Sequence, residues 1–71
     1  MPGLIAKGET KEVKSYDFFT ISDDGTLSFG GLSCEILNSS GGRVGPIGDG
    51  SNMEVSKGWS CYVQKGKVTL E

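Results

Sequence analysis

The chain has 71 residues, of which 35% are hydrophobic and 12 are glycine, and its formal net charge is −2. A chain of this length forms one domain, residues 1–71, with a small core. Histidine is absent from the sequence, which removes the commonest general base and the commonest transition-metal ligand. We therefore expect a non-catalytic protein with no cofactor and no metal site.

The charge balance and the start of the chain indicate which partners and which targeting signals to expect. Seven basic residues stand against nine acidic ones, so no global field attracts the chain to phosphate backbones or anionic lipid. The segment Met1 to Lys7 has neither a basic leader nor an apolar run of signal-peptide length. No stretch is apolar over the length that spans a bilayer. We expect a soluble chain without a membrane partner.

Short alternating runs follow one another along the chain, separated by Gly, Asp, Asn and Ser, and no window repeats apolar residues with helical spacing. The predicted strands are residues 4–6, 12–15, 17–21, 26–29, 32–37, 53–55, 59–64 and 67–70. The pattern predicts an all-β fold with little or no helix. We expect a small antiparallel barrel or sandwich of about six to eight short strands, of SH3-like or OB-like size.

Two turns are predicted between these strands. The pair Asp24-Gly25 follows the apolar residue Ile21 and can supply the positive φ angles of a tight hairpin. Gly66 can do the same between the strand that begins at Trp59 and the last strand. Two segments, 32–36 and 59–63, match each other weakly, but the match is short and their following loops differ in length. We therefore attribute the match to chance and infer no repeat architecture from it.

Residues 38–52 are rich in glycine and are predicted to be mostly loop and the most mobile part of the molecule. Pro46 lacks an amide donor, so any strand over residues 43–47 should be short or lie at an edge. Loops on rigid scaffolds often carry function. Arg43 and Ile47 are therefore predicted contacts for a partner; the alternative is a plain connection between strands.

Side chains alternate across a strand, so each run has one apolar face that points to the core. Trp59 has the largest side chain of this set and is expected to anchor the core. The predicted core consists of Phe19, Ile21, Leu27, Phe29, Leu32, Cys34, Ile36, Met53, Val55, Trp59, Cys61, Val63, Val68 and Leu70. The two cysteines in it have two interpretations: a disulfide that reinforces a small domain, or two buried free thiols that act as small hydrophobic residues.

Tyr16 and Phe18 lie on the strand face opposite Phe19, and Tyr62 lies opposite Cys61, so these three aromatic side chains point away from the core. Exposed aromatic rings can stack on bases or sugars. The alternative is that they pack beneath the N-terminal strand or against a second copy. Few basic residues accompany them, which weakens the case for nucleic acid.

The leading functional interpretation is a non-catalytic interaction or structural module, as in a subunit of a virion, a surface layer or a multi-subunit complex. Unpaired strand edges favour a protein partner or self-association. The alternative is a small β-barrel that binds single-stranded nucleic acid or a glycan through its aromatic face. The predicted binding residues are Tyr16, Phe18, Arg43, Ile47 and Tyr62.

Overall fold

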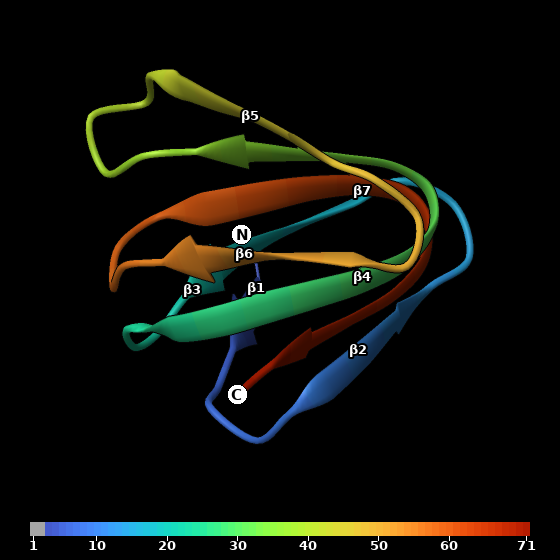
Figure 1. Cartoon of the computed structure of the whole chain (residues 1–71), viewed down its shortest axis with the longest axis horizontal. Coiled ribbons are helices and arrows are strands. Elements are labelled where there is room, and N and C mark those ends of the chain that lie inside the picture. Colours follow the sequence, from blue (N-terminus) through green and yellow to red (C-terminus); the bar gives the residue numbers. More distant parts are fainter. Residues whose placement is uncertain (1–2) are drawn as a thin grey trace.

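The computed structural model describes residues 3–71, a range that forms seven strands and no helix (Figure 1). Met1 and Pro2, part of the segment searched for a leader, lie outside the described residues. Within that range, no helix is long and apolar enough to span a membrane. The all-β prediction is confirmed. The strands are β1 (Gly3–Ile5), β2 (Thr10–Val13), β3 (Asp17–Ile21), β4 (Gly25–Leu37), β5 (Arg43–Ile47), β6 (Ser51–Val55) and β7 (Ser60–Leu70).

The two longest strands, β4 and β7, pair antiparallel at the centre of one mixed sheet. The strand order is β1-β3-β7-β4-β5, while β2 pairs the C-terminal part of β7 and β6 pairs the N-terminal part of β4. The pairing of β1 with β3 is parallel and the others are antiparallel. Within residues 3–71 no pairing joins β1 to β5, so the sheet is open rather than closed into the barrel that was one expectation.

Both long strands bend where Gly31 pairs with Gly66, and Figure 1 shows them curving together at the right of the view. The φ angles are 148° at Gly31 and 137° at Gly66. A Cβ at Gly31 would lie 2.2 Å from the carbonyl oxygen of Lys65, and one at Gly66 would lie 2.2 Å from that of Gly30. Only glycine permits this approach of two backbones. The predicted turn at Gly66 is therefore wrong, because that residue lies inside a continuous strand.

Side chains from both sides of the bend form a single buried core. Leu32 is the exception to the predicted set: it is 60% exposed, because it lies beside the bend, where the buried positions of β4 change from residues 27 and 29 to residues 34 and 36. Trp59 precedes β7 and is only partly buried against the core, so it is not the central anchor. Met53 also packs against the core, and the buried members are Ile5, Val13, Phe19, Ile21, Leu27, Phe29, Cys34, Ile36, Ile47, Val55, Cys61, Val63, Val68 and Leu70.

The turn before β4 is not the predicted hairpin, because β3 and β4 do not pair with each other and instead flank β7. Gly25 does not have the positive φ expected of it and begins β4. Its lack of a side chain is still required, since a Cβ there would lie 2.4 Å from the carbonyl oxygen of Glu71. The Asp24 carboxylate instead accepts a hydrogen bond of 2.8 Å from the backbone amide of Lys57.

Residues 38–52 contain more strand than predicted, since β5 and the start of β6 lie within them. The expected edge position of a strand over residues 43–47 is confirmed: β5 ends the strand order, and its Pro46 faces Glu35 of β4. The mobility of this segment stays a prediction.

Two three-stranded units, β2-β3-β4 and β5-β6-β7, are related by a spacing of 34 positions. Buried Val13 corresponds to Ile47, Ile21 to Val55 and Leu27 to Cys61. The strand register repeats with the same spacing of 34. Phe19 pairs with Cys61, and the equivalent residues Met53 and Leu27 pair with each other. Each pairing among these six strands joins a strand of one unit to a strand of the other. The domain therefore consists of two interleaved units related by a pseudo-twofold axis.

This repeat is invisible in the sequence. Between residues 10–37 and 44–71 the aligned units share one identical residue, Ser22 with Ser56. The weak match between 32–36 and 59–63 has a different spacing and is unrelated to it. The sequence therefore did not predict this repeat, because what is repeated is the pattern of burial and pairing and not the residues.

Candidate functional site

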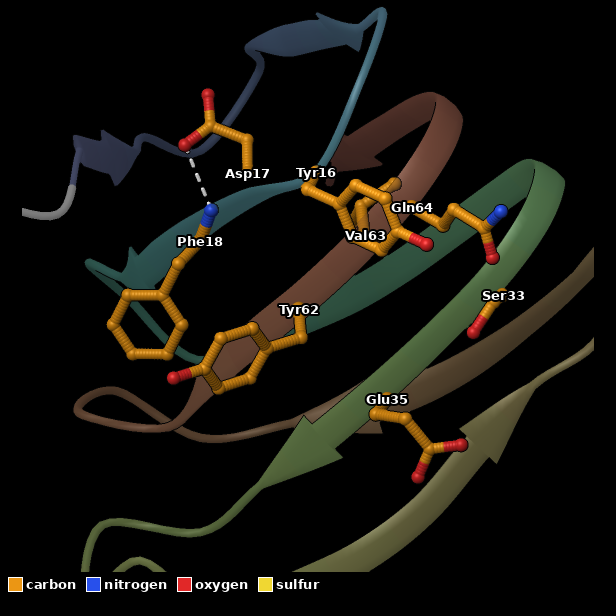
Figure 2. A pocket seen from close by; sticks show the side chains of 8 residues that line it. All are labelled: Tyr16, Asp17, Phe18, Ser33, Glu35, Tyr62, Val63 and Gln64. Carbon is orange, nitrogen blue, oxygen red and sulfur yellow. Dashed lines mark hydrogen bonds between the residues drawn. The ribbon is translucent and has the colours of Figure 1, made fainter.

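A hollow of about 420 Å³ lies on the outer face of the sheet, over β3, β7 and β4. We call it the aromatic hollow. Figure 2 shows Tyr62 at its centre, with Phe18 on one side and the β4 side chains of Ser33 and Glu35 on the other. The lining residues are Tyr16, Asp17, Phe18, Ser33, Glu35, Tyr62, Val63 and Gln64.

Strand register brings these residues together. Tyr62 of β7 pairs with Phe18 on one side and with Glu35 on the other, so the three side chains form a row across three strands on one face. The rings of Phe18 and Tyr62 are tilted by 49°, with centroids 4.4 Å apart, which is a favourable aromatic contact. Tyr62 nevertheless remains 53% exposed and Tyr16 74% exposed.

Unusual backbone angles coincide with the aromatic hollow. Among residues 3–71, Tyr16 and Ser33 are the two non-glycine residues with positive φ, at 49° and 57°, and both line it. The backbone amide of Tyr16 donates a hydrogen bond of 2.7 Å to the carbonyl oxygen of Gln64, which fixes the entry to β3 against β7. A bulky residue rarely adopts this conformation. The surrounding pairing therefore holds Tyr16 in place at some cost in strain.

The charged residues of the aromatic hollow are both acidic. The Asp17 carboxylate accepts a hydrogen bond of 2.7 Å from the amide of Phe18 and is directed away from the rings (Figure 2). The Nε of Arg43 donates to Oε1 of Glu35 at 2.6 Å, and this bond lowers the pKa of the Glu35 carboxyl. Glu35 is therefore ionised at neutral pH, and no lysine or arginine lines the hollow.

A second, smaller hollow of about 250 Å³ lies over β6, β4 and β7. We call it the polar hollow. Each of its eight lining residues is 34 positions from a residue that lines the aromatic hollow. Gly50 takes the place of Tyr16, Asn52 that of Phe18 and Ser28 that of Tyr62; the others correspond as Ser51 to Asp17, Lys67 to Ser33, Thr69 to Glu35, Phe29 to Val63 and Gly30 to Gln64.

The structure brings together three of the five residues predicted to bind a partner, Tyr16, Phe18 and Tyr62. Arg43 lies at the margin, through its bond to Glu35. Ile47 is 4% exposed and belongs to the core, so its side chain is not presented to a partner. Sequence reasoning missed Asp17, Ser33, Glu35 and Gln64 and predicted Val63 only as a core residue. Alternation predicts that residues 33 and 35 share one strand face and that residues 62 and 64 share another. Only the register between β4 and β7 shows that these two faces adjoin.

The remaining chemistry-bearing groups are the two cysteines. Both are buried and free, and burial raises the pKa of the Cys34 and Cys61 thiols to about 12. They are therefore weak nucleophiles at neutral pH. Across residues 3–71, no three acidic or cysteine side chains are placed to share a metal ion.

Comparison of the chain with known protein families, curated proteins and solved structures gives no match. The assignment of the site rests on its geometry.

Proposed function

We propose that this protein is a non-catalytic interaction module that binds a protein partner, within an assembly of several chains, through the aromatic hollow. The observation that carries the proposal is the internal comparison between the two hollows. Equivalent backbone positions hold Tyr16, Phe18 and Tyr62 on one face and Gly50, Asn52 and Ser28 on the other. The fold therefore does not require aromatic side chains at these places.

Exposed tyrosines without a role in folding are costly to leave on a surface, because they add apolar area that promotes non-specific association. Aromatic residues are enriched at protein interfaces, where they provide large contact areas with few rotatable bonds. Tyr16 and Tyr62 are both more than half exposed. Tyr62 stands on β7, and Tyr16 directly precedes β3 and is held by its amide hydrogen bond to Gln64. These properties support a preformed contact site for a partner side chain.

The nature of the lining supports binding rather than catalysis. The two acidic residues of the aromatic hollow have different hydrogen-bond partners: Asp17 accepts from the backbone amide of Phe18, and Glu35 accepts from Arg43. Neither is placed as a general acid with the other as base. The absence of basic residues in the lining leaves phosphate groups without a partner, which argues against single-stranded nucleic acid.

A glycan is the second candidate ligand. Ser33, Gln64 and one oxygen of Glu35 offer polar groups beside the rings, and such a mixture suits a sugar as well as a peptide.

The test uses an exchange variant, Tyr16→Gly with Tyr62→Ser, which places at these two positions the residues found at the equivalent positions of the polar hollow. The matched control is Asn52→Ala on the polar hollow. Immobilised wild type, exchange variant and control are each incubated with a lysate of the source organism, and every captured protein is then purified and tested for direct binding. We expect a partner that binds wild type and control and loses at least tenfold in affinity for the exchange variant.

Three outcomes would overturn the proposal: no protein bound directly, equal binding to the exchange variant, or loss of binding in the control alone. In a parallel arm the same three proteins are applied to a panel of oligosaccharides. Binding of a sugar that depends on Tyr16 and Tyr62, with no protein partner, would establish the glycan alternative instead. A second copy of the chain is detected in the same design by light scattering of the purified proteins.

A further inference from the structure

The aromatic hollow contains a carboxylate, that of Glu35, with a hydrogen bond to only one of its two oxygens. Arg43 donates its Nε to Oε1 of Glu35, while Oε2 accepts no hydrogen bond from any residue in the described range. The Glu35 side chain is 36% exposed, and it lines the hollow beside Tyr62. The second oxygen of this ionised carboxylate, at the edge of the hollow, is therefore free to accept a further donor.

Exposed aromatic rings line the same hollow as this carboxylate. The rings of Tyr16 and Tyr62 are exposed, and their electron-rich faces attract cations. Among cationic side chains, guanidinium is planar and weakly hydrated, stacks on rings and presents several N–H donors in a fixed fork. Stacked on Tyr62, such a group would reach Glu35 and also the hydroxyl of Ser33 or the amide of Gln64, which line the same hollow.

The polar hollow again serves as a comparison. It has Lys67 where the aromatic hollow has Ser33, and Thr69 where the aromatic hollow has Glu35. The two equivalent sites thus differ in charge as well as in aromatic content. A cation would be attracted to the first and repelled from the second.

From this arrangement we infer that the aromatic hollow binds an arginine side chain presented by the protein partner. The inference rests on the proposed function and specifies the chemistry of the partner's anchor: a guanidinium stacked on the tyrosine rings and hydrogen-bonded to the free oxygen of Glu35. Arg43 of this chain holds the other oxygen and competes for the same carboxylate.

The test measures binding of small probes to the purified protein by NMR, through amide and tyrosine-ring shifts. The probes are N-acetyl-arginine methylamide, its citrulline analogue, which has the same shape without the charge, and the corresponding lysine derivative. We expect the arginine probe to shift Tyr16, Tyr62 and Glu35, and the citrulline and lysine probes to bind at least about fivefold more weakly. Equal binding of arginine and citrulline, or of arginine and lysine, would overturn the inference.

Variants separate a specific site from a general acidic surface. Tyr62→Ser and Glu35→Gln should each weaken the arginine probe at least about fivefold, whereas Asn52→Ala should leave it unchanged. Arg43→Ala should strengthen it about two- to fivefold, because a competitor for Glu35 is removed. Weaker binding to Arg43→Ala, or shifts that persist in Tyr62→Ser, would contradict the proposed geometry.

The two proposals fail separately. If a protein partner depends on Tyr16 and Tyr62 but the arginine probe does not bind the hollow, the interaction module stands and the arginine anchor is wrong. If the exchange variant retains every partner, the proposed function itself is wrong.

Discussion

The two hollows of this domain occupy equivalent backbone positions, yet one is aromatic and acidic and the other is polar with a lysine. Eight lining positions correspond one to one at a spacing of 34 residues. Beneath them the core is apolar in both units, with Ile21 matched by Val55 and Phe29 by Val63. The two units thus agree where side chains are buried and differ where they are exposed.

This contrast separates the requirements of folding from those of function. Burial and strand pairing restrict residue type in the same way in both units, because each buries one face of the sheet in the shared core. The outer faces carry no such requirement. A set of exposed aromatic residues that appears on only one of them therefore supports the proposal that this face binds a partner. The predictions below test how far this separation holds.

The largest effect is expected at the bend that the two units share. Gly31→Ala would place a Cβ 2.6 Å from the Cα of Gly66 and closer still to a carbonyl oxygen. Neither contact can be relieved without separating β4 from β7, so we expect a loss of at least about 3 kcal/mol in unfolding free energy. Urea denaturation measures this loss.

The neighbouring glycine provides the control. A Cβ at Gly30 would have its nearest neighbour, the Asp49 carboxylate, at an ordinary 3.6 Å, and Gly30 does not have a positive φ. Gly30→Ala should therefore change stability by less than about 1 kcal/mol. Equal destabilisation by the two substitutions would show that the bend does not depend on the approach of the two backbones.

The second prediction concerns the core, where the units agree. Cys61 corresponds to Leu27 and Cys34 to Val68, so the thiols act as hydrophobic residues. Because burial raises their pKa values from 9.0 to about 12, the neutral thiols contribute stability that is complete below pH 9 and is lost as the pH rises toward 12. Between pH 9 and pH 10.5, we expect a decrease of about 2–4 kcal/mol in unfolding free energy.

The double variant Cys34→Val with Cys61→Val tests the cause. Its stability at pH 7 should lie within about 1–2 kcal/mol of wild type, and its alkaline decrease should be smaller. Iodoacetamide at pH 8 should modify the wild-type cysteines only after unfolding. Rapid modification of the folded protein, or identical alkaline profiles, would show that the thiols are accessible and not part of a tight core.

How much of this could be predicted depends on whether a feature is local. Alternation along single strands was enough for the all-β class and for core residues such as Ile21 and Val63. The bend could not be predicted, because it depends on Gly31 meeting Gly66 across strands. Leu32 was misplaced for a related reason: the alternation of buried side chains shifts at the bend, as it also does in β7 between Val63 and Val68.

The aromatic hollow was predicted only in part, because some of its features are local and others depend on strand register. Alternation placed Phe18 and Tyr62 on an outer face correctly. The position of Glu35 beside Tyr62 follows from the register between β4 and β7, a non-local property. The error at Ile47 arose because the surrounding glycines and Pro46 were interpreted as loop, while pairing with Cys34 draws that residue into the core.

The third prediction addresses the aromatic residues themselves. The exchange variant, Tyr16→Gly with Tyr62→Ser, should lose no more than about 1 kcal/mol of unfolding free energy. Glycine relieves the positive φ of Tyr16, which offsets part of the loss of the contact between Tyr62 and Phe18. Thermal unfolding followed by circular dichroism measures this. A loss above about 3 kcal/mol would mean that the aromatic face serves folding, and the contrast between the two hollows would lose its functional meaning.

The smallest effect is expected at the margin of the aromatic hollow. Thr69, the counterpart of Glu35, shares a hydrogen bond of 2.8 Å with the hydroxyl of Thr10, whereas Glu35 is paired with the exposed Arg43. Exposed ion pairs contribute little to stability, so Arg43→Ala should shift the melting temperature by no more than about 2 °C at pH 7.

The sign of the pH dependence follows from the carboxyl. Arg43 lowers the pKa of Glu35 below its ordinary value of 4.5, so the pair stabilises the fold above that pH and loses its effect as the pH falls through the lowered pKa. The melting curves of wild type and Arg43→Ala should therefore converge as the solution is acidified below pH 4.5. A difference that persists after Glu35 is protonated would show that Arg43 acts through packing and not through charge. In that case Arg43→Ala would also fail to free the carboxylate for a partner's arginine, and the competition inferred at the aromatic hollow would not exist.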